Sequence, residues 1–375
     1  MKKILILYAK YGGGHYSAAT AIKNYINNHY ENVETNIVDC MEYINRAINK
    51  ISTDAYKRIT TNTPRLWKTV YYKSEKGTLS RISSNTNKFM ARKLYYLIKD
   101  YSPDLIISTH MFSTQMVSYL KRKNKITCEL ATVLTDFAPH EQWLVGHQYG
   151  NYFFVSNDSM KNALINDFEV DESKVYTTGI PLSEKFSVNF DKKKIYESFG
   201  LDNTKKTILF FGGGEYGIGK DYTVSILKSL AKHIDTYQII AVSGKNKKMN
   251  EAFNNVASQL GSPKEIKIFD YITNVPEAMR ISNLVVTKPG GLTSSESLAS
   301  SLPMLIINPI PGQEEENAEF LEKSGVAIWL RPNDDMDLLI GNLLLSPKKL
   351  QEMSECTKAI AHINSTEKIC NILKI

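Results

Sequence analysis

The chain has 375 residues, of which 42% are hydrophobic and 23% charged, and its formal net charge is +7. This composition is that of an ordinary globular protein, and the length predicts two domains because one hydrophobic core rarely extends over so many residues. No apolar run approaches the roughly 18 residues of a membrane-spanning helix, and at the amino terminus we expect a strand rather than a signal peptide. The four cysteines are widely separated and form no CxxC pair, which is typical of reduced thiols in a cytoplasmic protein.

The positive charge is concentrated in residues 41–100, which carry 13 Lys and Arg against 4 Asp and Glu. Aromatic side chains are interleaved with these charges. Such a mixture suits the headgroup level of an anionic membrane, while a nucleic-acid surface or a solvated helical face are the alternatives. We therefore expect this segment to dock on a membrane, with Arg65, Trp67 and Lys68 in contact, and we expect no nucleic-acid partner.

Apolar runs of strand length alternate with helical patterns along the chain. The predicted strands of the first half are residues 4–9, 33–38, 105–109, 131–135 and 152–156, and those of the second half are residues 207–211, 238–242, 266–269, 284–287, 304–308 and 326–330. This alternation indicates an α/β protein with two doubly wound parallel sheets.

The domain boundary is expected in residues 179–192, which show no periodicity and carry a proline and several charges. This places an acceptor and membrane-docking domain at residues 1–185 and a nucleotide-binding domain at residues 186–349. One final helix, from residue 346 to about 375, has no sheet of its own to cover. We expect its residues 350–375 to cross back and pack on the first domain.

Three of the predicted strands end in glycine loops that open helices: Gly12–His15, residues 212–219, and residues 288–296. A helix N-terminus offers unpaired N–H groups and partial positive charge, which suit a phosphate. A single corner of this kind, a strand followed by a glycine loop and a helix, also occurs in an ordinary capped surface helix. Three such corners in one chain favour nucleotide chemistry at the carboxyl ends of parallel strands. The second loop resembles a P-loop, yet Asp221 stands where Ser or Thr would hold magnesium, so an NTPase is not expected.

Two residues at these strand ends are candidate proton acceptors. His15 opens the first helix, where its imidazole has a suitable intrinsic pKa, although it could instead cap the helix or bind a phosphate. Asp136 follows the strand 131–135 and could orient His15, bind an acceptor hydroxyl, act as the base itself, or form an Asx turn. No ligand set for a metal ion is recognised among the histidines, so metal-independent chemistry is expected.

Polar residues suited to sugar hydroxyls follow two of the later strands. Glu296 lies one turn into the helix of the third corner. Gln313, Glu314 and Asn317 belong to the loop of residues 308–317, which two prolines and a glycine stiffen. These groups favour a nucleotide-sugar ligand over a plain phosphate.

Together these motifs resemble the glycosyltransferase family of the monogalactosyldiacylglycerol synthases and the processive diacylglycerol glucosyltransferases, and more distantly the MurG-type transferases. The resemblance implies the GT-B fold, in which two Rossmann-like domains face a central cleft. The matching stretches span nearly the whole chain: Gly12–His15, residues 108–110, Thr135–Trp143, residues 179–181, Gly212–Gly214, Thr287–Glu296 and Pro311–Asn317.

The resemblance further implies inverting transfer of glucose or galactose from a UDP-sugar to the hydroxyl of diacylglycerol at the cytoplasmic face of the membrane, without a metal or other cofactor. It assigns His15 as the base or an acceptor contact, and we expect His15 to be the base ahead of Asp136. It also implies that the backbone of Ile272 pairs with uracil and that Glu296 holds the ribose. The donor residues are then Gly213, Gly214, Ile272, Gly291, Leu292, Thr293, Glu296, Gln313, Glu314 and Asn317, and the acceptor or membrane residues are Gly13, Gly14, His110, His140, Trp143, Trp67, Arg65 and Lys68.

Two rival functions remain open at this point. The same fold could support UDP-sugar epimerase or hydrolase chemistry, or a nucleotide-sugar sensor without catalysis. The serines of Ser294-Ser295 and Ser300-Ser301, which flank Glu296, stand where relatives often carry more apolar residues, and this difference bears on the phosphate contacts.

Overall fold

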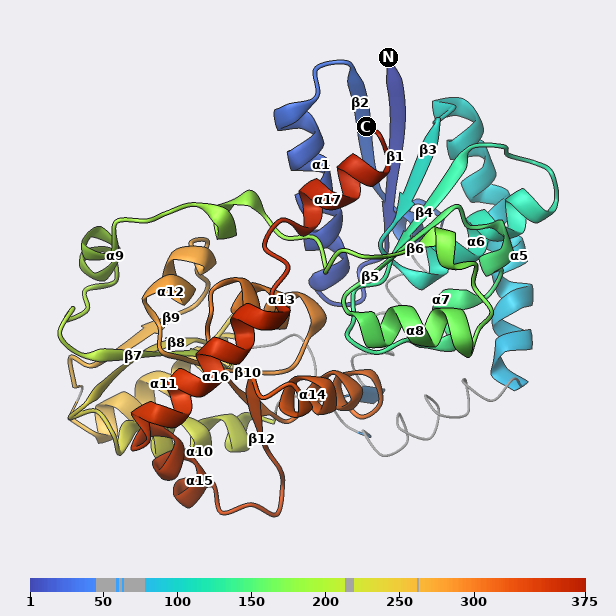
Figure 1. The fold of residues 1–375 in the computed structure, drawn as a ribbon. Helices are drawn as coiled ribbons and strands as arrows, with labels where there is room; N and C mark the ends of the chain where they lie inside the picture. Colours follow the sequence, from blue (N-terminus) through green and yellow to red (C-terminus); the bar gives the residue numbers. More distant parts are fainter. Residues whose placement is uncertain (45–58, 61–62, 64–77, 213–218, 262) are drawn as a thin grey trace.

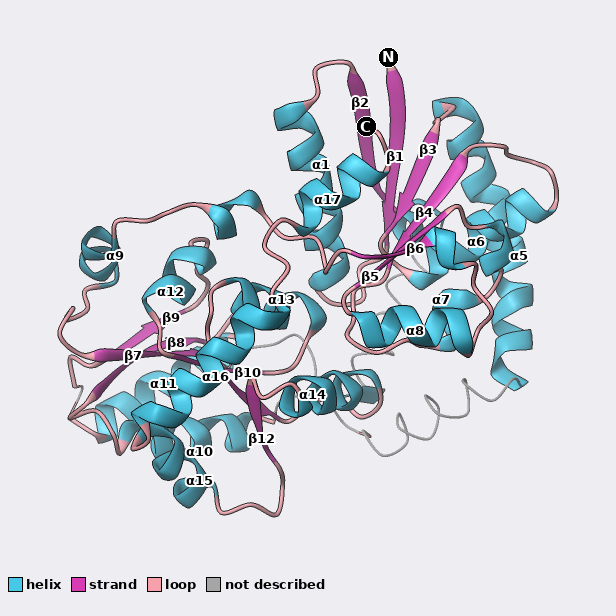
Figure 2. Ribbon diagram, viewed as in Figure 1, coloured by secondary structure: helices cyan, strands magenta, loops and turns pink. Residues whose placement is uncertain are grey.

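The computed structural model describes residues 1–44, 59, 60, 63, 78–212, 219–261 and 263–375, and it places them in two lobes (Figure 1). Each lobe is built on a six-stranded sheet in which every strand pairing is parallel. Helices cover both faces of each sheet (Figure 2). The prediction of two doubly wound parallel sheets is therefore confirmed.

The first sheet has the order β2-β1-β3-β4-β5-β6, and the second has the order β12-β11-β10-β7-β8-β9. The strands are β1 Lys2–Tyr8, β2 Val33–Asp39, β3 Leu105–Ser108, β4 Glu129–Val133, β5 Tyr152–Val155, β6 Val175–Thr177, β7 Lys206–Phe211, β8 Tyr237–Val242, β9 Ile266–Phe269, β10 Leu284–Thr287, β11 Met304–Ile307 and β12 Ala327–Leu330.

The helices follow the strands in the usual alternation. Those of the first lobe are α1 Gly14–His29, α2 Cys40–Ile44, α5 Thr78–Tyr101, α6 Met111–Arg122, α7 Glu141–Leu144 and α8 Asp158–Asn166. Those after it are α9 Lys192–Phe199, α10 Lys220–Ala231, α11 Lys247–Gln259, α12 Val275–Ile281, α13 Gly291–Ala299, α14 Gln313–Lys323, α15 Met336–Leu344, α16 Pro347–Ile360 and α17 Ser365–Ile372. Short 3₁₀ helices form at η1 His147–Tyr149, η2 Glu172–Lys174 and η3 Glu184–Ser187.

All eleven predicted strands are present, with ends that differ by one or two residues. The largest shift is in β4, which begins at Glu129 in register with Leu105 and ends before Thr135. One strand, β6, was not predicted. It has three residues at the edge of the sheet, two of them half-buried, and so few residues carry no periodic signal.

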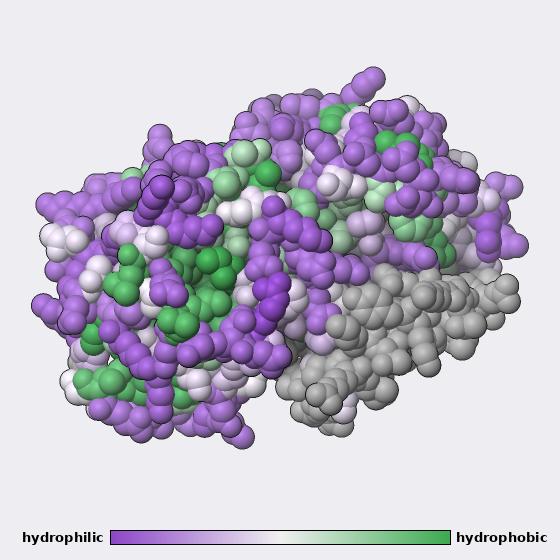
Figure 3. Space-filling view, turned by 60° about the horizontal axis from the view of Figure 1, so that its bottom comes forward, coloured by the Kyte–Doolittle hydropathy of each residue, from purple (hydrophilic) through white to green (hydrophobic). Residues whose placement is uncertain are grey.

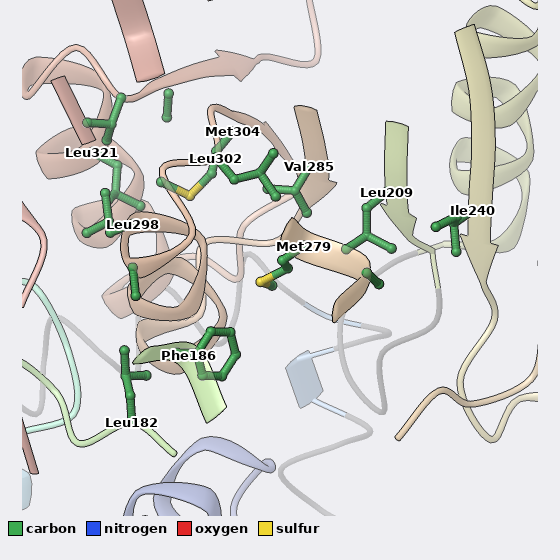
Figure 4. Packing of buried hydrophobic residues seen from close by; sticks show 14 of the residues in the cluster. Leu182, Phe186, Leu209, Ile240, Met279, Val285, Leu298, Leu302, Met304 and Leu321 are labelled. Carbon is green, nitrogen blue, oxygen red and sulfur yellow. The ribbon is translucent and has the colours of Figure 1, made fainter. Parts of the chain in front are cut away.

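The segment that joins the lobes is held by the core of the second lobe. Phe186 of η3 is buried among residues from α12 and α13 (Figure 4). The guanidinium of Arg280 also donates to the carbonyl of Phe186 at 3.0 Å. The expected linker at residues 179–192 thus contains an anchored helical turn.

The expected single C-terminal helix is wrong, because the chain forms two helices. α16 packs against α13 and α15 of the second lobe, whereas α17 packs against α1 of the first. Between them Ala361 is extended, since one straight helix cannot follow two differently oriented surfaces. The crossing back is therefore made by α17 alone, whose Ile369 and Cys370 join the core under α1.

The crossing also constrains Gly179. Its φ is +83°, and an added Cβ would overlap the side chain of His362 in the α16–α17 connection. We expect Gly179→Ala to lower the free energy of unfolding by about 2 kcal/mol or more, from backbone strain and overlap together. Gly261→Ala is the matched control, because Gly261 also has a positive φ (+77°) but open space around it. Thermal unfolding should show the larger loss for Gly179→Ala; equal losses would contradict the overlap.

Among the described residues, no helix is long and apolar enough to cross a membrane. On the face shown in Figure 3 most described residues are hydrophilic, and the largest apolar patches lie on the lobe that carries the second sheet. Leu338 and Leu345, in and after α15, are 61% and 75% exposed.

Candidate functional site

His15 lies at the start of α1, directly after the first glycine loop. Its Nδ1 is 2.8 Å from the carbonyl oxygen of Thr109 and 2.9 Å from the hydroxyl of Thr135. A carbonyl only accepts, so Nδ1 carries the proton and Nε2 keeps a lone pair. Burial lowers the pKa of His15 to about 4, which makes the ring neutral at physiological pH and leaves it a weak proton acceptor.

His110 and His140 both cap helices. The Nδ1 of His110 accepts from the N–H of Phe112 at 3.1 Å at the start of α6, and the Nδ1 of His140 accepts from the N–H of Gln142 at 3.1 Å at the start of α7. The ring of His110 also makes an edge contact with His15, with centroids 4.5 Å apart. His110 therefore packs against His15, and both expected acceptor-side histidines hold the start of a helix.

Trp143 is buried, with 1% of its surface exposed. Its ring lies 6.3 Å from the ring of His15 and 6.4 Å from that of His110. The expectation that Trp143 faces the acceptor or the membrane is corrected, because the side chain packs in the core and supports the two histidines.

The start of α13 approaches this part of the first lobe. Its N-cap is Gly290, which has no side chain to occupy the first N–H groups, so those of Gly291, Leu292 and Thr293 remain suited to an anion. An added Cβ on Gly291 would overlap the carbonyl oxygen of Thr135, and one on Gly14 would touch Leu292 at 3.6 Å. The glycine corners of the two lobes therefore lie against each other.

Asp136 joins the two lobes beside this contact. Its Oδ2 accepts from the amide of Gln313, and its Oδ1 accepts from the amide of Asn317 at 3.3 Å. The hydroxyl of Ser156 donates to the Asp136 carbonyl at 2.6 Å and fixes the backbone. Burial raises the pKa of Asp136 to about 7 despite the two amide donors, so this carboxyl titrates near neutral pH.

Asn317 has no exposed surface and links the lobes. Its Oδ1 accepts from the N–H of Phe137 at 2.8 Å, and its amide donates to the carbonyl of Pro289 at 3.1 Å as well as to Asp136. Both amide hydrogens are thus used within the protein. The expectation that Asn317 contacts the donor sugar is corrected, since its side chain instead holds Asp136 against the second lobe.

Glu314 forms an ion pair with Lys288 at 3.0 Å, and its Oε2 accepts from the N–H of Ile310 at 2.6 Å. Lys288 is not among the candidates from the sequence. Its position directly before the glycine turn at the start of α13 could have indicated it. Thr109 and Thr135 were also missed, because only the fold shows that they hold the His15 ring.

Ile272 is 5% exposed and packs in the core of the second lobe, so only its backbone is available to a ligand. Gly13 is the N-cap of α1 and Gly14 its first residue. Gly213, Gly214, Arg65, Trp67 and Lys68 lie outside the described residues. Within the described ranges, no three His, Cys, Asp or Glu side chains are grouped so that they could hold a metal ion.

Glu296 lies on α13, and burial raises its pKa to about 8. Hydroxyl donors from a ribose would favour the ionised carboxylate. We therefore expect the affinity for UDP to rise several-fold between pH 7 and pH 8.5, because fewer molecules then need to lose a proton on binding. Calorimetry in buffers of different ionisation enthalpy should detect the released proton, and Glu296→Gln should abolish the release. If the affinity of the unchanged protein for UDP does not depend on pH, Glu296 does not bind the ribose in its ionised form.

The chain matches two family models in succession. Residues 15–182 match monogalactosyldiacylglycerol (MGDG) synthase, and residues 207–368 match the glycosyltransferase family 28 C-terminal domain. S. aureus MnaA in a co-structure with UDP has a TM-score of 0.66 and 17% identity, covering 100% of this chain and 96% of that one. Acinetobacter baumannii MurG has a TM-score of 0.65 and 12% identity, covering 100% and 99%. These likenesses show that the fold is GT-B, as expected.

A curated relative is similar over almost its whole length. The processive diacylglycerol β-glucosyltransferase of Bacillus cereus strain 03BB102 is 31% identical over 359 residues, which are 96% of this chain and 89% of the relative. This identity, which extends over 96% of the chain, shows that the chain belongs to the processive diacylglycerol β-glucosyltransferase family.

Proposed function

We propose that the protein is an inverting glycosyltransferase that moves a hexose from a UDP-sugar to the hydroxyl of diacylglycerol, without a metal, to make a membrane glycolipid. The observation that carries the proposal is the contact between the lobes, at which the N-terminus of α13 meets Thr135 and Gly14 lies beside Leu292, while Asp136 is bonded to Gln313 of the other lobe. Family membership supports the choice of substrates, since the curated relative is named for glucosyl transfer to diacylglycerol.

The donor would lie along the second lobe. Glu296 holds the ribose hydroxyls, and the N–H groups of Gly291 to Thr293 hold the diphosphate. These fixed donors stabilise the negative charge that develops on UDP as it leaves. Gln313 and Glu314, at the start of α14, hold the hexose, and the backbone of Ile272 pairs with uracil.

Asp136 is the preferred base in this proposal, ahead of His15. A base works best when its pKa lies near the working pH, and Asp136 titrates near 7 whereas His15 titrates near 4. The acceptor hydroxyl attacks the anomeric carbon, the bond to UDP breaks, and the hydroxyl proton passes to Asp136. His15, with a free lone pair on Nε2, accepts a hydrogen bond that orients the attacking group.

Access to the lipid would come from the membrane surface. The excess of 13 basic over 4 acidic residues in positions 41–100 supports attraction to anionic lipid. We infer that the protein works as a peripheral protein at the cytoplasmic face of the membrane, where UDP-sugars are available.

Mass spectrometry of the lipids made by purified protein tests the proposal. UDP-glucose and UDP-galactose are each incubated with and without diacylglycerol in anionic vesicles. A hexosyl-diacylglycerol, with release of UDP that depends on the acceptor, is the expected result. Altered UDP-sugar without an acceptor would indicate an epimerase or hydrolase, and UDP-sugar binding without any product would indicate a sensor.

A further inference from the structure

One loop of the first lobe packs into the second lobe. Phe137, which directly follows Asp136 in the loop after β4, is 5% exposed and belongs to an apolar cluster in the core of the second lobe. Its ring stacks on that of Phe320 in α14, with centroids 5.3 Å apart and planes inclined by 15°. Such a pair adds attraction beyond the burial of its apolar area. Phe137 is therefore a residue of one lobe whose side chain packs as part of the other.

One face of α14 holds this loop. Gln313, Asn317 and Phe320 follow one another at intervals of four and three residues, so they lie on the same side of the helix. Gln313 and Asn317 donate to the two carboxylate oxygens of Asp136. Asn317 also accepts from the N–H of Phe137 at 2.8 Å. Two turns of a single helix thus fix the carboxylate, the backbone and the ring of two neighbouring residues.

The first lobe holds the same loop by its backbone carbonyl groups. The hydroxyl of Ser156 donates to the carbonyl of Asp136 at 2.6 Å, and the amide of Asn157 donates to the carbonyl of Phe137 at 2.9 Å. Asn157 is itself fixed, because its Oδ1 accepts from the N–H of Met160 at 2.9 Å and caps α8. The two carbonyls are therefore bonded to one lobe and the two side chains to the other, so the place of Asp136 depends on how the lobes meet.

We propose that Phe137, through its stack on Phe320, is a positioning residue that sets the carboxylate of Asp136 against the donor site and keeps water away from it. Phe137 and Asp136 are adjacent in the chain, so a shift of the ring also moves the carboxylate. The inference rests on the proposed function, in which Asp136 is the base. It adds that the base is correctly placed only while the ring of Phe137 is seated in the second lobe.

The exclusion of water gives this role a distinct signature in the pH dependence of the reaction. Asp136 is 6% exposed, and burial is the main cause that raises its pKa to about 7. The charges of Glu314 and Glu316 raise this pKa as well, and Glu314 is paired with Lys288. Loss of the Phe137 ring admits water and leaves these charges in place, so the carboxyl ionises at lower pH. The rise of kcat/KM with pH should then move to lower pH.

The test measures kcat, the affinity for UDP, and the pH dependence of kcat/KM for diacylglycerol at saturating UDP-hexose. We expect Phe137→Ala to lower kcat about 10²-fold, as a displacement of about 1 Å at a reacting group does. The affinity for UDP should stay within a few-fold of its original value, and the rise with pH should move to lower pH. Phe137→Leu and Phe320→Leu keep an apolar side chain in the contact, so they should show the same shift with a loss of about tenfold. Because both remove one stack, the double variant should lose no more than the larger single loss.

Phe199→Leu is the matched control. Phe199 is also 5% exposed, lies in the same apolar cluster and pairs with the half-buried Phe269 at 5.5 Å, but both rings belong to the second lobe. This variant should lose similar thermal stability while its kcat and pH profile stay as in the unchanged protein.

Three outcomes would overturn the inference. One is an equal fall of kcat in Phe199→Leu, and another is a fall in the Phe137 variants without movement of the pH profile, since either would indicate a general structural role. The third is an unchanged kcat in the Phe137 and Phe320 variants. In each case the proposed function stands, whereas absence of any transfer to diacylglycerol by the unchanged protein would refute the proposed function itself.

Discussion

Asp136→Asn is expected to reduce kcat about 10³-fold while leaving the affinity for UDP within a few-fold of its original value. The variant keeps the size of the side chain but removes the group that takes the acceptor proton, and loss of a general base costs typically 10²–10⁴-fold. Asp136 is held by Gln313 and Asn317 of the other lobe, and its pKa is raised to about 7. Initial rates with saturating UDP-hexose and calorimetric UDP binding measure the two quantities separately.

The pH dependence of the transfer reaction provides a second test of Asp136 as the base. Because the base must be ionised, kcat/KM for diacylglycerol, measured with saturating UDP-hexose, should rise with pH up to about 7 in the unchanged protein and then level off. This rise should be lost in Asp136→Asn. Asp100→Asn, which alters an exposed carboxyl on α5, is the control and should behave as the unchanged protein. If kcat survives in Asp136→Asn and falls in His15→Ala instead, the order of the two candidates is reversed.

Gly291→Ala should reduce transfer at least about 10²-fold. The added methyl group would overlap the carbonyl oxygen of Thr135 on the other lobe. The methyl group is fixed to the backbone and the carbonyl is part of it, so neither can rotate away, and the overlap is relieved only if the lobes separate. A displacement of about 1 Å at a catalytic site costs on the order of 10²-fold because donor and acceptor no longer align.

Gly290→Ala provides the matched comparison for this variant. Gly290 precedes Gly291, has an ordinary φ of −66°, and has open space around its Cβ position. Its replacement should therefore cost far less than that of Gly291 when both are measured as initial rates of transfer. If the two variants lose equal activity, the damage lies in the turn itself and not in the approach of the lobes.

The strands could be predicted because they are buried on both faces. Such strands read as continuous apolar runs, as in Leu284–Thr287, whose four residues are all buried. β6 escaped prediction because its three residues at a sheet edge give no such run. The division of the last helix into α16 and α17 also escaped, since it depends on which surfaces the two pieces cover and not on their own residues.

The glycine corners and Asp136 could be located from sequence because a strand end and a helix start are local features. A glycine turn followed by a helix exposes N–H groups wherever it occurs. What a local pattern does not contain is the partner of each group. Asp136 is hydrogen-bonded to Gln313 and Asn317, which lie 177 and 181 positions away in the sequence. The periodicity of either segment does not indicate this contact.

The sequence by itself determined the class of fold, the family and the segments that supply the chemistry, because apolar periodicity and helix-start motifs act over a few neighbouring residues. Only the tertiary structure decided that the side-chain amide of Asn317 is hydrogen-bonded between the lobes and that Trp143 is buried beside His15 and His110. The same holds for the pKa of Asp136, which is raised because packing removes the carboxyl from water. The burial of these side chains and the hydrogen bonds between distant residues depend on how the two lobes pack against each other. This packing depends on the whole chain and not on any short segment.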